Sequence, residues 1–458
     1  MNIFNKKYIF FFLLTTLIKT IFSIDQKKLV IMSQHNKNYE SEDKLIFAFQ
    51  YMRHGARSPC RLMTKNLTDL FGQKWEGICE LTQKGYYQLY KMGLINRERY
   101  QNLLNFKEPN SYETYAYASI SNRTLMTANA ILHGMYTDKN KPTEEQLTIP
   151  VHNIANNVKG DTIPVFYYTD KSNCRKWLEL MKFNFMRKDL VNYEKIFLEK
   201  YRNVLDELKK TNADFAEIEQ NTKIIRVFCD NFISNYYDGR KIDLFTQLKY
   251  TDEQLYNLYL DCHETNLMRY TKIYFGYEAQ YVSTIVISEY MRKLLDYMDN
   301  IIKNPEANPK FVLYAGHQST VAGMELYLNK IFNVPYDIMF YGSHQEFLLY
   351  KDKNNEKYLL KYFYNDELKL TIEYKEFRKK VMDNTVNKED TEFFCQSYTK
   401  TDYLTLGLCC GIIILFVFII NIFRYFYDCN KVKKFYLREE SNNNNNATQK
   451  EINIKVIN

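Results

Sequence analysis

Two arginines and a histidine lie within five consecutive positions of the sequence, at Arg53, His54 and Arg57. Guanidinium groups match phosphate oxygens with paired N–H donors, so two of them beside an imidazole suit an anion, and phosphate above all. Gly55 lets the backbone come close to such a ligand. An isolated arginine or histidine in a loop is usually solvated. The pattern Arg-His-Gly-x-Arg, however, should arise by chance in a chain of this length only on the order of once in several hundred proteins.

The elements around this run place it at the edge of a predicted sheet. Residues 45–52 are apolar and β-prone, which predicts a buried strand that ends just before the run. Arg123 follows a second predicted strand, residues 114–119, and His317 follows a third, residues 311–315. Parallel strands bring their carboxyl ends to one edge of an open α/β sheet, where such folds bind ligands. We therefore expect these side chains to gather there.

These residue types support phosphoryl transfer. A neutral imidazole can attack phosphorus and form a phosphoramidate that water later hydrolyses, provided that fixed positive charge holds the three equatorial oxygens. Three arginines can supply that charge, and His317 a further hydrogen bond. The departing alkoxide then needs a proton, which a carboxylic acid normally gives.

The rest of the pattern predicts helices and strands that alternate around a helical insertion. Helices are predicted over residues 86–100, with Thr82 as N-cap, 125–136, 282–302 and 321–331; short strands over residues 149–154 and 165–169; and an antiparallel hairpin over residues 344–350 and 358–364. Residues 173–280 are mainly helical in pattern and predict a cap over the sheet.

Together these motifs resemble the histidine acid phosphatases, the branch of the histidine phosphatase superfamily that includes prostatic, lysosomal and phytase-type enzymes. The matching segments are Arg53 to Pro59, Leu81-Thr-x-x-Gly85, Arg123 to Met126 and Gly316-His317, spread over residues 44–365. The resemblance implies an α/β fold like that of phosphoglycerate mutase: a mixed, mostly parallel sheet flanked by helices, with an inserted helical cap. It implies no cofactor. It also implies His54 as the nucleophile, with Arg53, Arg57, Arg123 and His317 forming the phosphate pocket.

One position departs from the family pattern. Acid phosphatases of this family usually have an aspartic acid directly after the second histidine, where it protonates the leaving group, and this chain has Gln318. An amide cannot act as that acid, and loss of general-acid help typically costs about 100- to 10,000-fold in rate. Three outcomes remain open. Another acid such as Glu346 takes the place of the aspartic acid; substrates with good leaving groups, or low pH, compensate for its loss; or the protein is a phosphate-binding relative with little activity.

The two ends of the chain predict a secreted, membrane-anchored topology. Lysines precede an apolar run near the amino terminus, as in a signal peptide, and residues 403–423 carry no charge and are long enough to span a bilayer. Basic residues after this span predict a cytosolic tail. The predicted organisation is residues 1–23 signal peptide, 24–374 luminal or extracellular phosphatase domain, 375–402 polar stalk, 403–423 transmembrane helix and 424–458 cytosolic tail. This is a single-pass type I membrane protein, lysosome-like or at the cell surface.

Cysteine usage fits an oxidising compartment. Six cysteines fall in the predicted luminal part, which allows up to three disulfides and leaves fifteen pairings open. No Cys-x-x-Cys or His-x-x-x-His spacing occurs, so no structural zinc is expected. Asn66 and Asn122 begin glycosylation sequons, and we expect Asn122 to be unoccupied because a glycan there would crowd Arg123.

The net charge of +8 comes with many interspersed acidic residues, which argues against a nucleic-acid partner. Two hypotheses follow: a membrane-anchored acid phosphatase acting on small phosphate monoesters, or a catalytically weak phosphate-ligand-binding relative. A cytosolic mutase of the same superfamily disagrees with the predicted signal peptide. Whether the protein forms a homodimer is left open.

Overall fold

The computed structural model describes most of the predicted phosphatase domain and one helix beyond it. The described residues are 43–61, 66–106, 112–136, 144, 165–168, 188–218, 222–270, 279–335, 337–353, 357–387, 389–390, 407–408, 411–428 and 430–431. The chain divides into two compact units, Met1–Cys395 and Gln396–Asn458. The predicted signal peptide and the predicted strand at residues 149–154 lie outside the described residues.

A seven-stranded mixed sheet forms the centre of the first unit, in the order β3-β2-β4-β1-β5-β6-β7. The strands are β1 (Lys44–Arg53), β2 (Thr114–Ser119), β3 (Val165–Tyr168), β4 (Phe311–Gly316), β5 (His344–Lys351), β6 (Tyr358–Tyr364) and β7 (Glu367–Glu373). Strands β1 to β4 pair in parallel, whereas β5, β6 and β7 join by antiparallel pairing. The predicted mixed sheet and its hairpin are confirmed.

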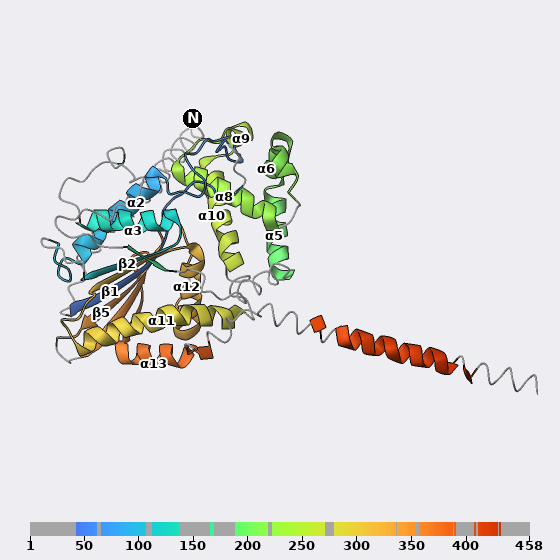
Figure 1. Ribbon diagram of the computed structural model, residues 1–458. Coiled ribbons are helices and arrows are strands. Elements are labelled where there is room, and N and C mark those ends of the chain that lie inside the picture. Colours follow the sequence, from blue (N-terminus) through green and yellow to red (C-terminus); the bar gives the residue numbers. More distant parts are fainter. Residues whose placement is uncertain are drawn as a thin grey trace, which may run out of the picture. The chain divides into compact units, whose positions relative to one another are not determined.

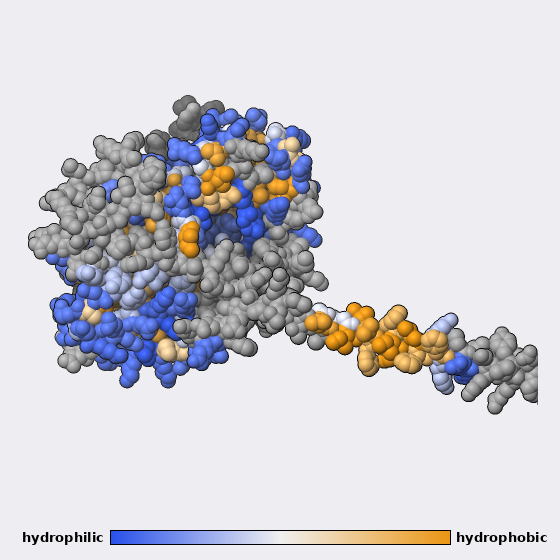
Figure 2. All heavy atoms as spheres, in the orientation of Figure 1, coloured by the Kyte–Doolittle hydropathy of each residue, from blue (hydrophilic) through white to orange (hydrophobic). Residues whose placement is uncertain are grey.

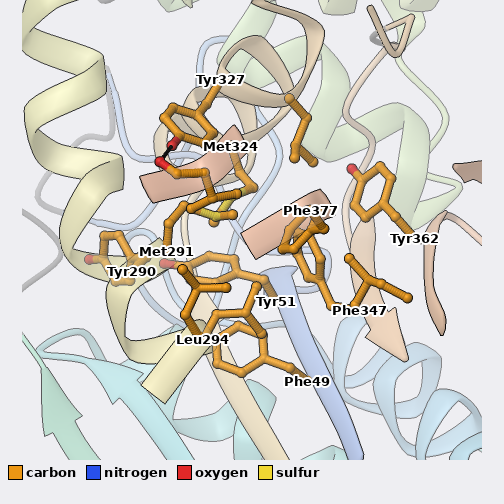
Figure 3. Close-up of a cluster of buried hydrophobic side chains, with 14 of the residues drawn as sticks. Phe49, Tyr51, Tyr290, Met291, Leu294, Met324, Tyr327, Phe347, Tyr362 and Phe377 are labelled. Atoms are coloured by element: carbon orange, nitrogen blue, oxygen red, sulfur yellow. Dashed lines mark hydrogen bonds between the residues drawn. The ribbon is translucent and has the colours of Figure 1, made fainter. Parts of the chain in front are cut away.

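Strand β1 lies inside the sheet because both of its faces are apolar. Phe47, Phe49 and Tyr51 point into one buried cluster, shown in Figure 3 with Phe49 beside Tyr51 and helix residues around them. Ala48 and Met52 belong to a second cluster on the opposite face. This alternation is the period of two that a strand imposes. A strand covered on both faces can hold a loop rigidly at its end.

Helices cover both faces of the sheet (Figure 1). The face with Ala48 and Met52 packs against α2 (Gln83–Arg99) and α3 (Asn122–Tyr136). The face with Phe49 and Tyr51 packs against α11 (Ala279–Lys303), α12 (Gln318–Phe332) and α13 (Tyr374–Asn384). Helix α2 begins after Thr82, whose side chain accepts from the backbone N–H of Gly85, as predicted. Both α3 and α12 begin three residues earlier than the apolar pattern predicts, because that pattern misses polar first turns.

Helices α2 and α3 touch through their backbones. A Cβ atom at Gly93 would overlap the carbonyl oxygen of Ile131, and one at Gly134 would overlap that of Tyr90. The missing side chains therefore allow the two helices to approach more closely than any other residue would permit. This contact sets how far apart the two helices lie.

The region between β3 and α11 is helical in its described residues, as predicted. It contains α5 (Lys188–Lys200), α6 (Arg202–Thr211), α7 (Ala213–Ala216), α8 (Thr222–Asp238), α9 (Asp243–Gln247) and α10 (Asp252–Arg269). These helices share a buried cluster that also takes in Ala56 and Tyr341. A disulfide, Cys229–Cys262, joins α8 to α10, and a second, Cys60–Cys79, closes the loop after β1.

The predicted stalk at residues 375–402 is wrong in its first part. Strand β7 and helix α13 continue the folded unit to Asn384, and Tyr374, Phe377 and Val381 are buried in the core. The many charged residues of α13 mask a narrow apolar stripe at positions i, i+3 and i+7, which is enough to dock a short helix.

In the second unit, Gly411–Asp428 forms a helix long and apolar enough to cross a membrane. Figure 2 shows its apolar side chains in orange. It overlaps the span predicted at residues 403–423. Length and composition alone support a membrane role here.

Candidate functional site

The two histidines predicted to share a sheet edge lie side by side. Strands β1 and β4 pair in parallel with Arg53 opposite Gly316, the last residue of each strand. The backbone N–H of His54 then donates to Gly316 O at 2.9 Å, and the rings of His54 and His317 lie 5.6 Å apart between centroids. Parallel pairing with matched strand ends thus brings residues 263 positions apart together.

His54 is held with one ring nitrogen fixed. Its Nδ1 lies 2.9 Å from Gly55 O, and a carbonyl oxygen only accepts, so Nδ1 carries the hydrogen and Nε2 the lone pair. Burial, and then the positive charges of Arg53, Arg123 and Arg57, lower the pKa of His54 well below its ordinary 6.5. The side chain is therefore a neutral imidazole with a free nitrogen.

Arg53 and Arg57 lie around a ring that the sequence analysis missed. The guanidinium carbon of Arg53 lies 4.5 Å, and that of Arg57 5.8 Å, from the ring centroid of Tyr341, and the His54 ring lies 5.8 Å from it. Arg53 also donates to Met339 O at 2.6 Å. Cation–π contact and this hydrogen bond fix the guanidinium groups beside the imidazole.

Arg57 is also tied to the helical region. Its Nη2 lies 2.6 Å from Oδ1 of Asp230 on α8, while Oδ2 of Asp230 accepts from the backbone N–H of Cys60 at 2.6 Å. Burial alone would lower the pKa of Arg57, but the paired carboxylate raises it. The helical region therefore positions one cation of the site.

His317 lies between Arg123 and a serine. Arg123 Nη2 is 3.2 Å from Nδ1 of His317, and because a guanidinium only donates, Nδ1 accepts. Its Nε2 then carries the hydrogen and donates to Ser119 Oγ at 2.9 Å. Ser119 is the last residue of β2, so its place at a strand end was a signal that the sequence analysis passed over.

Gln318 directly follows His317 as the first residue of α12, and it is buried. Its Nε2 is buried, and the described residues offer it no hydrogen-bond partner. A buried donor without a partner is costly unless a ligand satisfies it. This amide can therefore bind an anionic oxygen.

Glu346, suggested from the sequence as a substitute acid, is held elsewhere. Its Oε1 accepts from Gln50 at 3.1 Å and from the hydroxyl of Tyr100 at 2.9 Å, and its Oε2 pairs with Arg99. Glu346, His344 and Asp366 lie close enough to ligate a metal ion, yet the Arg99 guanidinium already forms ion pairs with both carboxylates. This cluster joins β5 to α2 and is structural.

The described residues thus combine a neutral imidazole, three guanidinium groups, a second imidazole and an unpartnered amide donor at one sheet edge. Such a set can hold the oxygens of a phosphoryl group and present a nucleophile to its phosphorus. The six residues that the sequence predicted for a site all lie at or just after the ends of β1, β2 and β4. Sequence reasoning missed Tyr341, Asp230 and Ser119, which position them.

Comparison with known proteins gives a consistent result. The family model of the histidine phosphatase superfamily (branch 2) matches residues 64–365, more than half of the chain. The lysosomal acid phosphatase of Xenopus laevis is 24% identical over 419 residues, which cover 85% of this chain and 88% of that protein. The lysosomal acid phosphatase of Rattus norvegicus is 25% identical over 346 residues, covering 71% and 72%.

Among solved structures, the phytase from Citrobacter braakii superposes with a TM-score of 0.50 at 13% identity, covering 75% of this chain and 98% of the phytase chain. At this identity the likeness shows a shared fold.

Proposed function

Because the chain belongs to branch 2 of the histidine phosphatase superfamily, we propose that it hydrolyses phosphate monoesters through a phosphohistidine formed on His54. Its relatives include prostatic and lysosomal acid phosphatases, and the chain is a phosphatase of that family. The observation that carries the proposal is the hydrogen bond from His54 Nδ1 to Gly55 O. It leaves the lone pair on Nε2 of an imidazole that lies near the positive charges of three arginines.

In the proposed first step, Nε2 of His54 attacks phosphorus as the bond from phosphorus to the ester oxygen breaks. Negative charge spreads over the three equatorial oxygens, which Arg53, Arg57 and Arg123 stabilise because their positions are fixed before the substrate arrives. His317 and the amide of Gln318 add hydrogen bonds. In the second step water attacks the phosphohistidine, releases inorganic phosphate and restores His54.

A second candidate function rests on Gln318. Its buried, unpartnered Nε2 suits phosphate binding, but an amide cannot protonate a leaving alkoxide. A phosphate-ligand-binding protein with little turnover would have the same pocket. The two candidates differ in whether an ester is cleaved.

Alkaline trapping of the labelled intermediate tests the covalent step. Full-length protein mixed with an aryl phosphate labelled in its phosphoryl group, and then quenched in alkali, should carry label that survives alkali and is lost in acid, because phosphoramidates hydrolyse in acid. Rapid hydrolysis without labelled protein, or a label stable to acid, would remove His54 from its proposed role. A protein that binds phosphate tightly but cleaves no ester would support the second candidate.

The pH profile should reflect the lowered pKa of His54. Protonation below that pKa removes the lone pair, so the acid limb of kcat/KM should lie below pH 6.5, with activity retained as pH falls from 6.5 towards it. Arg123→Gln removes one of the charges that lower this pKa and should move the acid limb to higher pH. Because both proteins are assayed with the same aryl phosphate, the titration of the substrate contributes equally to both pH profiles and does not affect the difference between them. An acid limb that stays in place in the variant would contradict this account.

The proposed topology is a type I membrane protein, with Gly411–Asp428 near or within the span and the phosphatase domain in the lumen or outside the cell. The sequence features at both ends support it, and so do the disulfides Cys60–Cys79 and Cys229–Cys262, which favour an oxidising compartment. The helices from α5 to α10 would then act as the cap that selects the substrate.

A further inference from the structure

The reaction needs a proton for its leaving group, and Gln318 cannot give one. We propose that Glu80 is the general acid of this phosphatase, an assignment that rests on the proposed hydrolysis of phosphate monoesters. Glu80 lies on the loop before α2, outside every motif that the sequence analysis singled out.

The backbone of Glu80 is fixed to the loop that carries His54. Ser58 N donates to Glu80 O at 2.8 Å, and Glu80 N donates to Ser58 Oγ at 3.0 Å. Next to these bonds, the disulfide Cys60–Cys79 closes the same pair of segments. The position of Glu80 relative to the nucleophile loop is therefore rigid.

Its side chain reaches across to the segment that carries Arg123. Oε2 of Glu80 accepts from Asn122 Nδ2 at 2.6 Å, and Asn122 directly precedes Arg123, which contacts His317. The carboxyl group thus joins the loop that supplies the nucleophile to the start of α3, which supplies Arg123. Glu80 is half-buried and Asn122 is exposed, so this carboxyl group lies on the solvent side of the segment that carries Arg123, and we place the departing ester oxygen there.

The described residues bring a second carboxylate to the same loops, Asp230, but both of its oxygens are engaged. Oδ1 pairs with Arg57 and Oδ2 accepts from Cys60 N, so its negative charge is needed to hold Arg57. Glu346 is likewise bound by Arg99 and Tyr100. Glu80 differs because Oε1 has no hydrogen-bond partner among the described residues and its side chain is half-buried.

The hydrogen bond from Asn122 also orients the acid. Because Asn122 donates to Oε2, the proton of the acid resides on Oε1, the oxygen that is available to a leaving group. As Nε2 of His54 bonds to phosphorus, Oε1–H gives its proton to the departing oxygen and an alcohol leaves. The Glu80 carboxylate then takes a proton from the water that attacks the phosphohistidine, which returns both groups to their starting state.

The test compares Glu80→Gln with the unaltered full-length protein on two esters. Phenolic leaving groups such as that of p-nitrophenyl phosphate need little protonation, whereas the alkoxide of glycerol 2-phosphate needs it fully. We expect kcat/KM to fall about 100-fold or more for the alkyl ester and by less than about threefold for the aryl ester. Glu76→Gln, an exposed glutamate on the same loop, is the matched control and should leave both rates unchanged.

Two further measurements keep the result interpretable. Inorganic phosphate should raise the melting temperature of Glu80→Gln as it does that of the parent, which shows an intact pocket. If Glu80→Gln does not fold, Asn122→Ala decides the question: it removes only the orienting bond and should slow the alkyl ester selectively, by roughly tenfold.

The role of Glu80 would be overturned if Glu80→Gln, or Asn122→Ala in its place, had the same ratio of kcat/KM for the alkyl ester to kcat/KM for the aryl ester as the unaltered protein. The phosphatase proposal would then still stand. If the unaltered protein cleaves neither ester, the proposed function is overturned, and this role with it.

Discussion

His54→Ala should reduce the hydrolysis of p-nitrophenyl phosphate by at least about 10⁴-fold, because it removes the atom that bonds to phosphorus. The remaining arginines still bind the phosphoryl group, so inorganic phosphate should continue to raise the melting temperature of the variant. The combination of lost turnover with retained binding separates a missing nucleophile from a damaged pocket. Steady-state kinetics and thermal melting with and without phosphate measure the two effects.

The matched control is His133→Gln. His133 lies on α3, packs against Tyr90 and contacts the hydroxyl of Tyr86, away from the sheet edge. It should retain the rate of the parent. Comparable activity in His54→Ala and His133→Gln would mean that another group attacks phosphorus.

Glu346→Ala should lower the free energy of unfolding by about 3–5 kcal/mol. The Glu346 side chain is 1% exposed and that of Arg99 is 19% exposed, so removing the carboxylate leaves a mostly buried guanidinium with Asp366 as its one remaining described acidic partner. The hydroxyl of Tyr100 and the amide of Gln50 also lose their acceptor. Urea denaturation of the parent and the variant measures the difference.

Glu289→Ala provides the comparison for this prediction. Glu289 pairs with Lys293 on the exposed side of α11, and both side chains are about half exposed. Exposed pairs of this kind contribute about 0.2–1 kcal/mol. Equal losses of stability in the two variants would show that the Glu346 cluster is solvated, and that its role in joining β5 to α2 is wrong.

The sequence predicted most of the sheet and the strand ends that carry the candidate site, because the local apolar pattern and the direction of the chain determine them. Strands β1 and β4 are apolar runs that end in chemically distinctive residues, and two parallel strands bring their ends to one edge whatever lies between them. The nearness of His54 and His317 therefore follows without knowledge of the intervening residues. The helix starts were less well predicted, because polar first turns carry no apolar period.

The supporting residues could not be found in this way. Asp230 pairs with Arg57 across 173 positions, and Tyr341 contacts the arginines from a segment without regular secondary structure. Neither contact leaves a local signal. Glu346 shows the converse. The sequence suggested it as one possible substitute acid, but the surroundings of a strand residue are set by its neighbours in the sheet and by the helix that covers it.

The contact between Gly93 and Gly134 also affects the position of the residues around the pocket. Helix α2 starts beside the loop that carries His54, and α3 starts with Asn122 and Arg123, so the crossing of the two helices fixes the distance between two walls of the pocket. A methyl group at either glycine would act as a wedge and move those walls apart. The separation of these walls, and with it the size of phosphate ester that fits between them, therefore depends on two glycines in a helix crossing.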